Sequence, residues 1–182
     1  SRCSLRERSV STTDTVTAVP AASTPAVAAL LRANVAHRIH TYEHDPRVRS
    51  YGTEAADILT ERFDIHADQI LKTLVVRCTD ASLAVAVLPV TTSLSPKNVA
   101  SALRTRKVAM ADRAEAERST GYVFGGISPL GQKRALPTVV DDSVLEWDRI
   151  FCSGGRRGLE VELDPRDLIR LTRAVTAPVA PQ

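Results

Sequence analysis

The sequence predicts an α/β fold, a single domain with a mixed, curved central sheet flanked by helices. Segments 70–76 and 83–90 are rich in Val, Leu, Ile and Ala and are the strongest predicted strands. Predicted strands outnumber predicted helices and alternate with them only in part, which favours a mixed sheet over an all-parallel one. The chain has 182 residues, of which 43% are hydrophobic and 25% charged, enough for one domain with a sizeable core.

Three helices are predicted by a capping residue followed by proline, which fits the first helical position because that position needs no N–H donor. These pairs are Thr24-Pro25, Ser95-Pro96 and Asp164-Pro165. The first helix is expected to end near residue 33. The last is expected to turn the apolar side chains of Leu168, Ile169, Leu171 and Val175 inward.

Two further helices have weaker boundary signals. One is expected to begin after a cap at Thr53. The other is expected to begin with a capping box formed by Asp112 and Glu115 and to stop before Gly121. Shorter strands are predicted at 37–42, 107–110, 137–140, 150–152 and 159–163.

The predicted domain occupies residues 23–177. Residues 1–22 combine Ser, Thr, Arg and Ala without hydrophobic periodicity, which predicts a disordered tail. Residues 178–182 are predicted to fray. The chain has no apolar run near the roughly 20 residues that a membrane helix needs, so we expect no membrane association.

The composition favours a cytoplasmic protein without a metal or cofactor. Cys3, Cys78 and Cys152 are scattered and form no C-x-x-C pair, which is typical of a reducing compartment. His40 and His44 are four residues apart, but on a strand and turn this spacing does not bring two ligands together as it does on a helix. The formal net charge of +3 is a mild bias toward polyanionic partners.

A glycine-rich segment, residues 119–133, is the strongest candidate for a binding loop. Gly125 and Gly126 allow the backbone to turn sharply and to approach a ligand, and exposed N–H groups there could bind an oxyanion. Pro129 stiffens the segment and pushes Ser128 toward an extended conformation. The spacing fits neither a P-loop, because Lys133 comes one place late, nor a nucleophile elbow. As a bare pattern, the segment fits a structural turn equally well.

Lys72 is the most unusual single residue. Alternation along the strand 70–76 places it on the same face as Leu74 and Val76. A lysine on an apolar strand face either extends its ammonium to solvent at the sheet rim or meets an anionic partner. Thr73 points the other way, and its backbone N–H is available at the rim. Base rates favour the rim lysine, and the sequence pattern leaves both readings open.

Seven motifs, in chain order, resemble the bacterial YbaK proteins, stand-alone cysteinyl-tRNA(Pro) deacylases related to the editing domain of prolyl-tRNA synthetase. They extend from residue 24 to residue 159, and the resemblance continues to about residue 174. The motifs are Thr24-Pro-Ala-Val27, His40-Thr-Tyr-Glu-His-Asp-Pro46, Lys72-Thr-Leu-Val75, Met110-Ala-Asp112, Arg118-Ser-Thr-Gly-Tyr122, Gly125-Gly-Ile-Ser-Pro-Leu-Gly-Gln-Lys133 and Ser153-Gly-Gly-Arg-Arg-Gly-Leu159.

The resemblance implies an editing domain that hydrolyses the ester of misacylated Cys-tRNA(Pro) and has aminoacylated tRNA, and prolyl-tRNA synthetase, as partners. A second, hydrolytic site is needed because apolar pockets discriminate poorly between small side chains. The resemblance further implies that the substrate thiol attacks the neighbouring carbonyl, so that no protein nucleophile is required. Lys72 corresponds to the lysine on which the family's activity depends. The implied substrate-binding residues are Tyr42, Tyr51, Thr73, Gly125, Gly126, Ile127, Ser128 and Glu160.

Two other functions fit parts of the pattern. One is a non-catalytic module with the editing-domain fold that binds tRNA or a synthetase. The other is a serine hydrolase that uses Ser128, although no histidine and aspartate partners are evident in the sequence.

Overall fold

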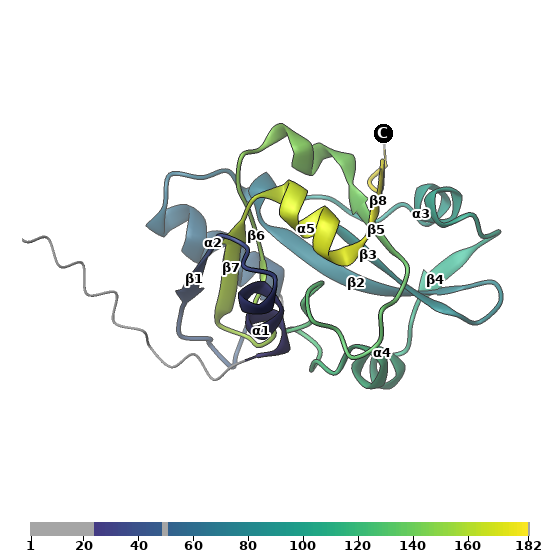
Figure 1. The fold of residues 1–182 in the computed structure, drawn as a ribbon, viewed down its shortest axis with the longest axis horizontal. Helices are drawn as coiled ribbons and strands as arrows, with labels where there is room; N and C mark the ends of the chain where they lie inside the picture. Colours follow the sequence, from purple (N-terminus) through teal and green to yellow (C-terminus); the bar gives the residue numbers. More distant parts are fainter. Residues whose placement is uncertain (1–23, 49–50, 182) are drawn as a thin grey trace, which may run out of the picture.

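The computed structural model describes residues 24–48 and 51–181 and shows an α/β domain built on two connected sheets (Figure 1). The larger sheet is mixed: β2 pairs antiparallel with β3 and β4, whereas β3, β5 and β8 run parallel. Its strands are β4 (Val108–Met110), β2 (Leu71–Cys78), β3 (Leu83–Pro89), β5 (Thr138–Asp141) and β8 (Val175–Ala177), in spatial order. The predicted fold class is confirmed.

The smaller sheet is antiparallel and lies at the left in Figure 1. Its strands, in spatial order, are β1 (His37–Thr41), β7 (Leu159–Leu163) and β6 (Ile150–Ser153). A parallel bridge between Ile70 and Phe151 connects it to the larger sheet. The base of β2 therefore lies beside β6, at the junction of the two sheets.

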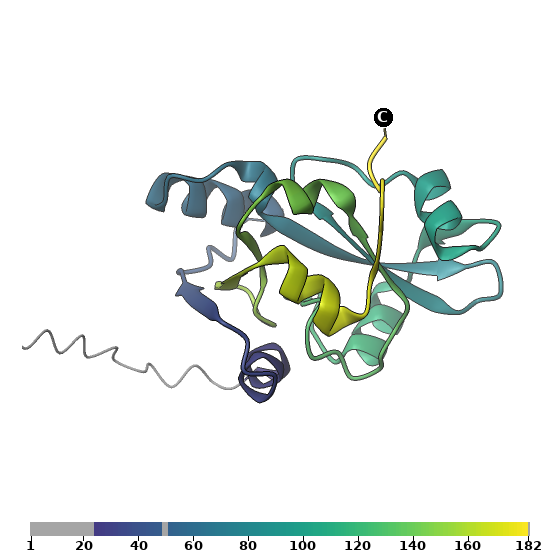
Figure 2. The ribbon, with the colours of Figure 1, turned by 45° about the horizontal axis from the view of Figure 1, so that its top comes forward.

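The helices cover both sides of the larger sheet. They are α1 (Pro25–Arg32), α2 (Tyr51–Arg62), α3 (Pro96–Leu103), α4 (Arg113–Thr120) and α5 (Pro165–Thr172), with short 3₁₀ helices at Ala67–Gln69 and Asp142–Glu146. α3 and α4 lie on opposite sides of the end that carries β4, and α5 crosses in front of the sheet in both views (Figures 1 and 2).

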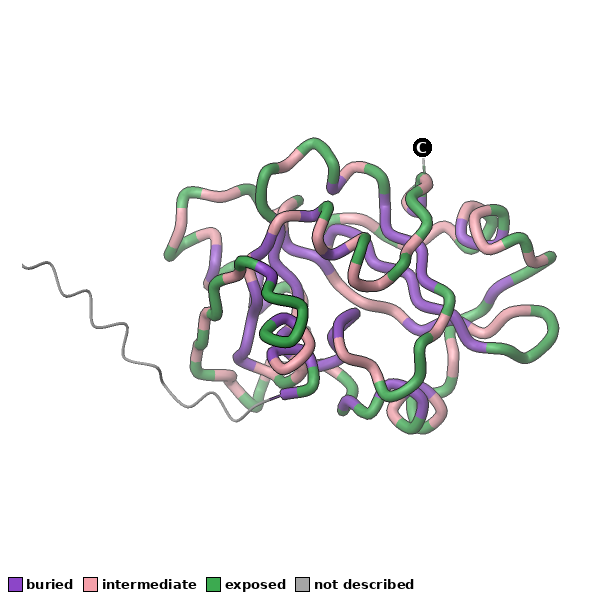
Figure 3. The backbone as a smooth tube through the Cα atoms, in the orientation of Figure 1, coloured by how far each residue is buried: buried purple, intermediate pink, exposed green. Residues whose placement is uncertain are grey.

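Alternation along β2 and β3 divides the core into two layers, and β3 is buried along its whole length (Figure 3). On one face, Val75, Val85 and Val87 join the main cluster, to which α1 contributes Leu30 and α5 contributes Leu168. The opposite face joins a second cluster, which α3 closes with its apolar side: Val76, Ala84, Ala86, Leu88, Val99 and Ala100. Both faces of β3 are buried, which explains its continuous apolar sequence.

The three proline-marked helix starts are confirmed. Thr24, Ser95 and Asp164 are N-caps, and the side-chain oxygen of each accepts a backbone N–H from the first turn. Thr24 has a second role, because its hydroxyl donates to the carbonyl of Gly154 at 2.5 Å. The cap of α1 is thus tied to the loop between β6 and β7.

Two predictions about helix starts are wrong. α2 begins at Tyr51, so Thr53 lies inside its first turn and is not its cap. Asp112 is the N-cap of α4 but makes no capping hydrogen bond through its side chain. Glu115 instead accepts a hydrogen bond from Arg77 on β2. A tertiary ion pair has therefore replaced the local capping box.

The end of the chain also differs from prediction. α5 ends at Thr172 because Arg173 adopts a left-handed conformation, and Val175 begins β8 instead of facing the core. The predicted fraying after residue 177 is wrong for Val179, which is fully buried. Its N–H donates to Asp141 Oδ1 at 2.8 Å and its carbonyl accepts from the N–H of Ser95. The predicted tail 1–22 lies outside the described residues.

Among the described residues, no helix is both long enough and apolar enough to span a membrane.

Candidate functional site

A cavity of about 300 Å³ lies where the two sheets meet, at the lower end of the volumes typical of ligand pockets. The smaller sheet, the β2 strand, the start of α2 and the glycine-rich loop after α4 all contribute to its walls. Six of the nine predicted site residues line it: Tyr42, Lys72, Thr73, Gly125, Ile127 and Glu160. Residues far apart in the sequence are thus brought together by the fold.

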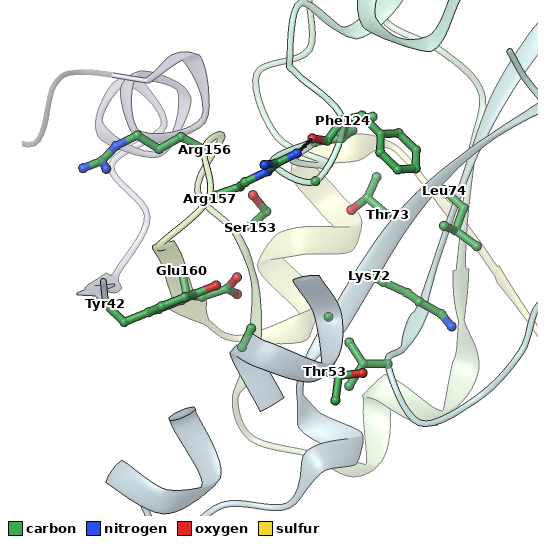
Figure 4. A pocket seen from close by; sticks show the side chains of 15 residues that line it. Tyr42, Thr53, Lys72, Thr73, Leu74, Phe124, Ser153, Arg156, Arg157 and Glu160 are labelled. Atoms are coloured by element: carbon green, nitrogen blue, oxygen red, sulfur yellow. Dashed lines mark hydrogen bonds between the residues drawn. The ribbon is translucent and has the colours of Figure 1, made fainter. Parts of the chain in front are cut away.

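One wall is formed by the smaller sheet (Figure 4). Ser153 on β6 is paired directly with Glu160 on β7, so the two side chains lie on the same face. Tyr42 follows β1 on this wall, and its N–H donates to the carbonyl of Gly158. The wall therefore presents a phenol, a hydroxyl and a carboxyl group to one space.

Glu160 is the most perturbed acid of this wall. It is 7% exposed, and burial raises the pKa of its carboxyl to about 8. Its Oε2 is buried without a hydrogen-bond partner. Burial, together with the nearby Glu160 and Glu54 carboxyls, raises the pKa of Tyr42 to about 12. Burial therefore favours the proton-bearing form of both groups, which can donate hydrogen bonds.

The facing wall is the first half of β2, where the strand has a free edge. β4 pairs only with Val76–Cys78, and the carbonyl of Val75 accepts from the N–H of Ala111 on that side. Backbone groups two residues apart in a strand point the same way, so the N–H and C=O of Thr73 also point to this side, beyond the end of β4. The Thr73 hydroxyl is buried without a hydrogen-bond partner. This edge therefore offers unused polar groups to a ligand.

Lys72 lies on the same wall, beside Thr73 and Leu74. It is partly exposed, and burial of its side chain lowers the pKa of the ammonium. Among the described residues, no carboxylate lies within ion-pair distance of it, although the chain forms other surface ion pairs. In Figure 4 its amine points to the side of the cavity away from Tyr42 and Glu160. An anionic group at that side could pair with it.

The glycine-rich loop closes the cavity against the β6–β7 loop. Gly125 has φ of +91°, a conformation that glycine adopts without strain. Gly126 packs so closely on the other loop that a Cβ there would lie 2.8 Å from the Cα of Arg156. Ser153 Oγ donates to the carbonyl of Gly126 at 3.2 Å, and Arg157 Nη2 donates to that of Phe124 at 3.0 Å. The two loops form one unit.

Gly126 and Ser128 contribute to this unit from outside the cavity wall. The N–H of Gly126 donates to the carbonyl of Val123 at 2.9 Å, which closes the turn. Ser128 is fully buried and its hydroxyl accepts from the N–H of Leu130. A buried hydroxyl that does not line the cavity is poorly placed for nucleophilic attack, which argues against the serine-hydrolase reading. Tyr51, the ninth predicted residue, has a side chain outside the described part of the structure.

Nine lining residues were not predicted as site residues, and those with polar or aromatic side chains are Thr53, Phe124, Ser153, Arg156 and Arg157. The two arginines and Ser153 belong to a serine- and glycine-rich turn, a signal that could have marked a second binding loop. Phe124 sits between the two motifs of the first loop and carries no local signal. His40 and His44 diverge, since the first contacts Glu162 and the second contacts Glu54.

Comparison with known proteins gives the family from sequence and a shared fold from structure. The model of the aminoacyl-tRNA editing domain matches residues 51–171. A protein of Enterococcus faecalis named "Putative Cys-tRNA(Pro)/Cys-tRNA(Cys) deacylase EbsC" is 34% identical over 125 residues, which cover 69% of this chain and 76% of that protein.

Two solved structures have the same fold. One, titled "Crystal structure of a putative trans-editing enzyme for prolyl tRNA synthetase", superposes with a TM-score of 0.69 at 20% identity and covers 80% of this chain and 87% of its own. The other, hypothetical protein APE2540, has a TM-score of 0.72 at 26% identity, and the match covers 84% of this chain and 96% of that protein's chain. The chain therefore belongs to the aminoacyl-tRNA editing domain family, and the resemblance to the YbaK deacylases is confirmed.

Proposed function

We propose that this protein is a trans-editing deacylase that hydrolyses the ester of misacylated Cys-tRNA(Pro). The observation that carries the proposal is a pair of buried polar atoms without a hydrogen-bond partner, Thr73 Oγ1 and Glu160 Oε2, on two residues that line the cavity. Leaving a buried polar group unpaired costs about 1–3 kcal/mol, a cost that a polar ligand can remove. The E. faecalis relative, named as a deacylase of cysteinyl-tRNA, supports the choice of substrate.

The cavity suits a small amino acid attached to a ribose. Glu160, Tyr42 and Ser153 would hold the amino-acid end, where a proton-bearing carboxyl can bind a neutral amine or, once ionised, an ammonium. The N–H groups of Gly125 and Thr73 would point to the ester carbonyl, where negative charge develops. Lys72 would neutralise the terminal adenosine phosphate or the departing ribose oxygen.

The hydrolysis we propose is assisted by the substrate. The cysteine sulfur attacks the adjacent carbonyl carbon, the C–S bond forms as the ester C–O bond breaks, and the thiol proton passes to the ribose oxygen. Water then opens the resulting thiolactone to free cysteine. Neither histidine nor cysteine lines the cavity among the described residues, so the protein's contribution is orientation and electrostatic stabilisation.

Single-turnover deacylation of Cys-tRNA(Pro) tests the proposal. We expect Lys72→Ala to lower the rate at least about 100-fold, because removing a charge that stabilises the transition state costs roughly 3 kcal/mol. Lys97→Ala is the matched control, since Lys97 is an exposed lysine on α3 away from the cavity. Equal activity in wild type and Lys72→Ala would contradict the role of Lys72.

A second substrate tests substrate assistance separately from deacylase activity. Ser-tRNA(Pro) carries a hydroxyl in place of the thiol, and a hydroxyl is a far weaker nucleophile at neutral pH because it is almost fully protonated. We therefore expect Ser-tRNA(Pro) to be hydrolysed at least 100-fold more slowly. Equal rates for both esters would show that water attacks directly, and would leave the deacylase intact but remove substrate assistance.

The same assay addresses the partners. Addition of prolyl-tRNA synthetase should raise the deacylation rate at limiting enzyme if the two proteins act together. Stable binding of tRNA or of the synthetase without any release of cysteine would identify a non-catalytic module instead.

A further inference from the structure

Phe124 is an exposed aromatic side chain at the cavity. It is 44% exposed, and its ring projects from the glycine-rich loop toward Thr73 and Leu74 on β2 (Figure 4). Single exposed apolar side chains are common at protein surfaces, but this one lines the cavity, so its ring is available to a ligand bound there.

The Phe124 ring is held in place from several directions. The guanidinium of Arg113 lies over the ring, 5.3 Å from its centroid. Arg113 is itself fixed by Glu117, whose carboxylate also accepts the N–H of Phe124 at 3.0 Å. Arg157 donates to the carbonyl of Phe124 from the facing loop. Such anchoring reduces the entropy that a ligand must pay to order the ring.

The surroundings of the ring suit an anionic ligand. Lys72 and Arg157 line the same cavity, whereas the guanidinium of Arg156 points away from the ring (Figure 4). Glu160 has the one carboxyl group among the described lining residues, and it lies across from the ring on the other wall. Aromatic rings beside arginine and lysine are the usual platform for a nucleotide base, which stacks on the ring while cations contact the phosphate. The cavity thus has a polar side at Glu160 and an aromatic, basic side at Phe124.

We propose that Phe124 is the stacking platform for the adenine base of the tRNA 3′-terminal nucleotide. The base stacks on the ring, and Lys72 contacts its phosphate. The carboxyl side of the cavity is left for the amino acid. This subsite rests on the proposed function and adds a positioning residue that makes no contact with the reacting bond.

AMP and ribose 5-phosphate test the subsite directly. Trp147 is the chain's one tryptophan, so Phe124→Trp in a Trp147→Phe background places a single fluorophore at the platform. We expect AMP to quench this fluorescence saturably and ribose 5-phosphate to leave it unchanged, because only AMP carries a base. Equal responses to both probes would overturn the stacking role. This titration measures binding without any deacylation, so a protein that binds AMP but does not hydrolyse Cys-tRNA(Pro) would be recognised as such.

Kinetics provide the second readout. Stacking of a base on an aromatic ring strengthens binding, so Phe124→Ala should raise the KM for Cys-tRNA(Pro) roughly 5- to 100-fold, with a smaller change in kcat. Phe124→Leu keeps the apolar bulk and should behave like the alanine variant, whereas Phe124→Tyr should behave like wild type. Val123→Ala, a change at a 65% exposed neighbour that does not line the cavity, is the control. A wild-type KM in Phe124→Leu would show that apolar packing, not stacking, is what matters.

Discussion

Glu160 shows how a single buried side chain links the site to the stability of the protein. Its carboxyl is buried near the Tyr42 phenol and has no cationic partner within ion-pair distance among the described residues. Keeping such a group neutral costs nothing at low pH, but ionising it inside the protein is unfavourable. The same property that prepares the site for a ligand therefore makes the empty protein sensitive to pH.

The unfolding free energy should fall as pH rises from about 4.5 to about 8. In that window the unfolded chain has released the Glu160 proton while the folded protein, with its raised pKa, still holds it. The contribution is fully present below the unfolded pKa, declines by at most about 1.4 kcal/mol per pH unit, and is lost above the folded pKa. Urea denaturation at several pH values measures it.

Glu160→Gln isolates this contribution, because the amide does not titrate. The difference in unfolding free energy between wild type and Glu160→Gln should change steadily between pH 5 and pH 8 and be constant above about pH 9. A difference that does not vary with pH would mean that the Glu160 carboxyl is ionised in the folded protein.

At the scale of elements, the caps illustrate what the sequence can specify. Thr24-Pro25, Ser95-Pro96 and Asp164-Pro165 were predictable because capping is decided within one turn of chain. The prediction of a capping box was wrong because the Glu115 carboxylate accepts a hydrogen bond from Arg77, which lies thirty-eight residues away in the sequence. The prediction for Val175 was wrong because α5 ends at Thr172, where Arg173 adopts a left-handed conformation.

The cavity residues divide in the same way. Lys72 and Gly125 were identified because each violates a local expectation, a charge in an apolar strand and a paired glycine turn. Phe124 and Ser153 obey local expectations and line the cavity only because two loops come into contact. The hydrophobic pattern of a single segment cannot predict a contact between two loops that are distant in the sequence.

Thr24 should matter more than an ordinary cap. Thr24→Ala removes the α1 cap and also leaves the carbonyl of Gly154 without its donor, so we expect a loss of about 2–3 kcal/mol in unfolding free energy. Ser95→Ala removes only the α3 cap and should cost about 1 kcal/mol. Chemical denaturation of both variants gives the comparison, and equal losses would show that the Gly154 contact is not stabilising.

For the molecule as a whole, the last residues of the chain complete the core. Val179 is buried between α3 and the larger sheet, so Val179→Ala should lower the unfolding free energy by about 2 kcal/mol. Val175 on β8 is 49% exposed, and Val175→Ala should change the unfolding free energy by less than about 0.5 kcal/mol. Thermal unfolding distinguishes the two; similar stabilities would mean that the C-terminal segment is not docked in solution.

The shortness of β4 has a consequence for solubility. An unpaired strand edge can recruit a strand from another molecule, and longer edges do so more readily. Here β4 covers β2 from Val76 onward and the bridge to Phe151 on β6 lies at its base, so the unpaired edge is limited to the short stretch around Thr73. A stretch this short can hydrogen-bond a small ligand but is too short to pair with a strand of another molecule.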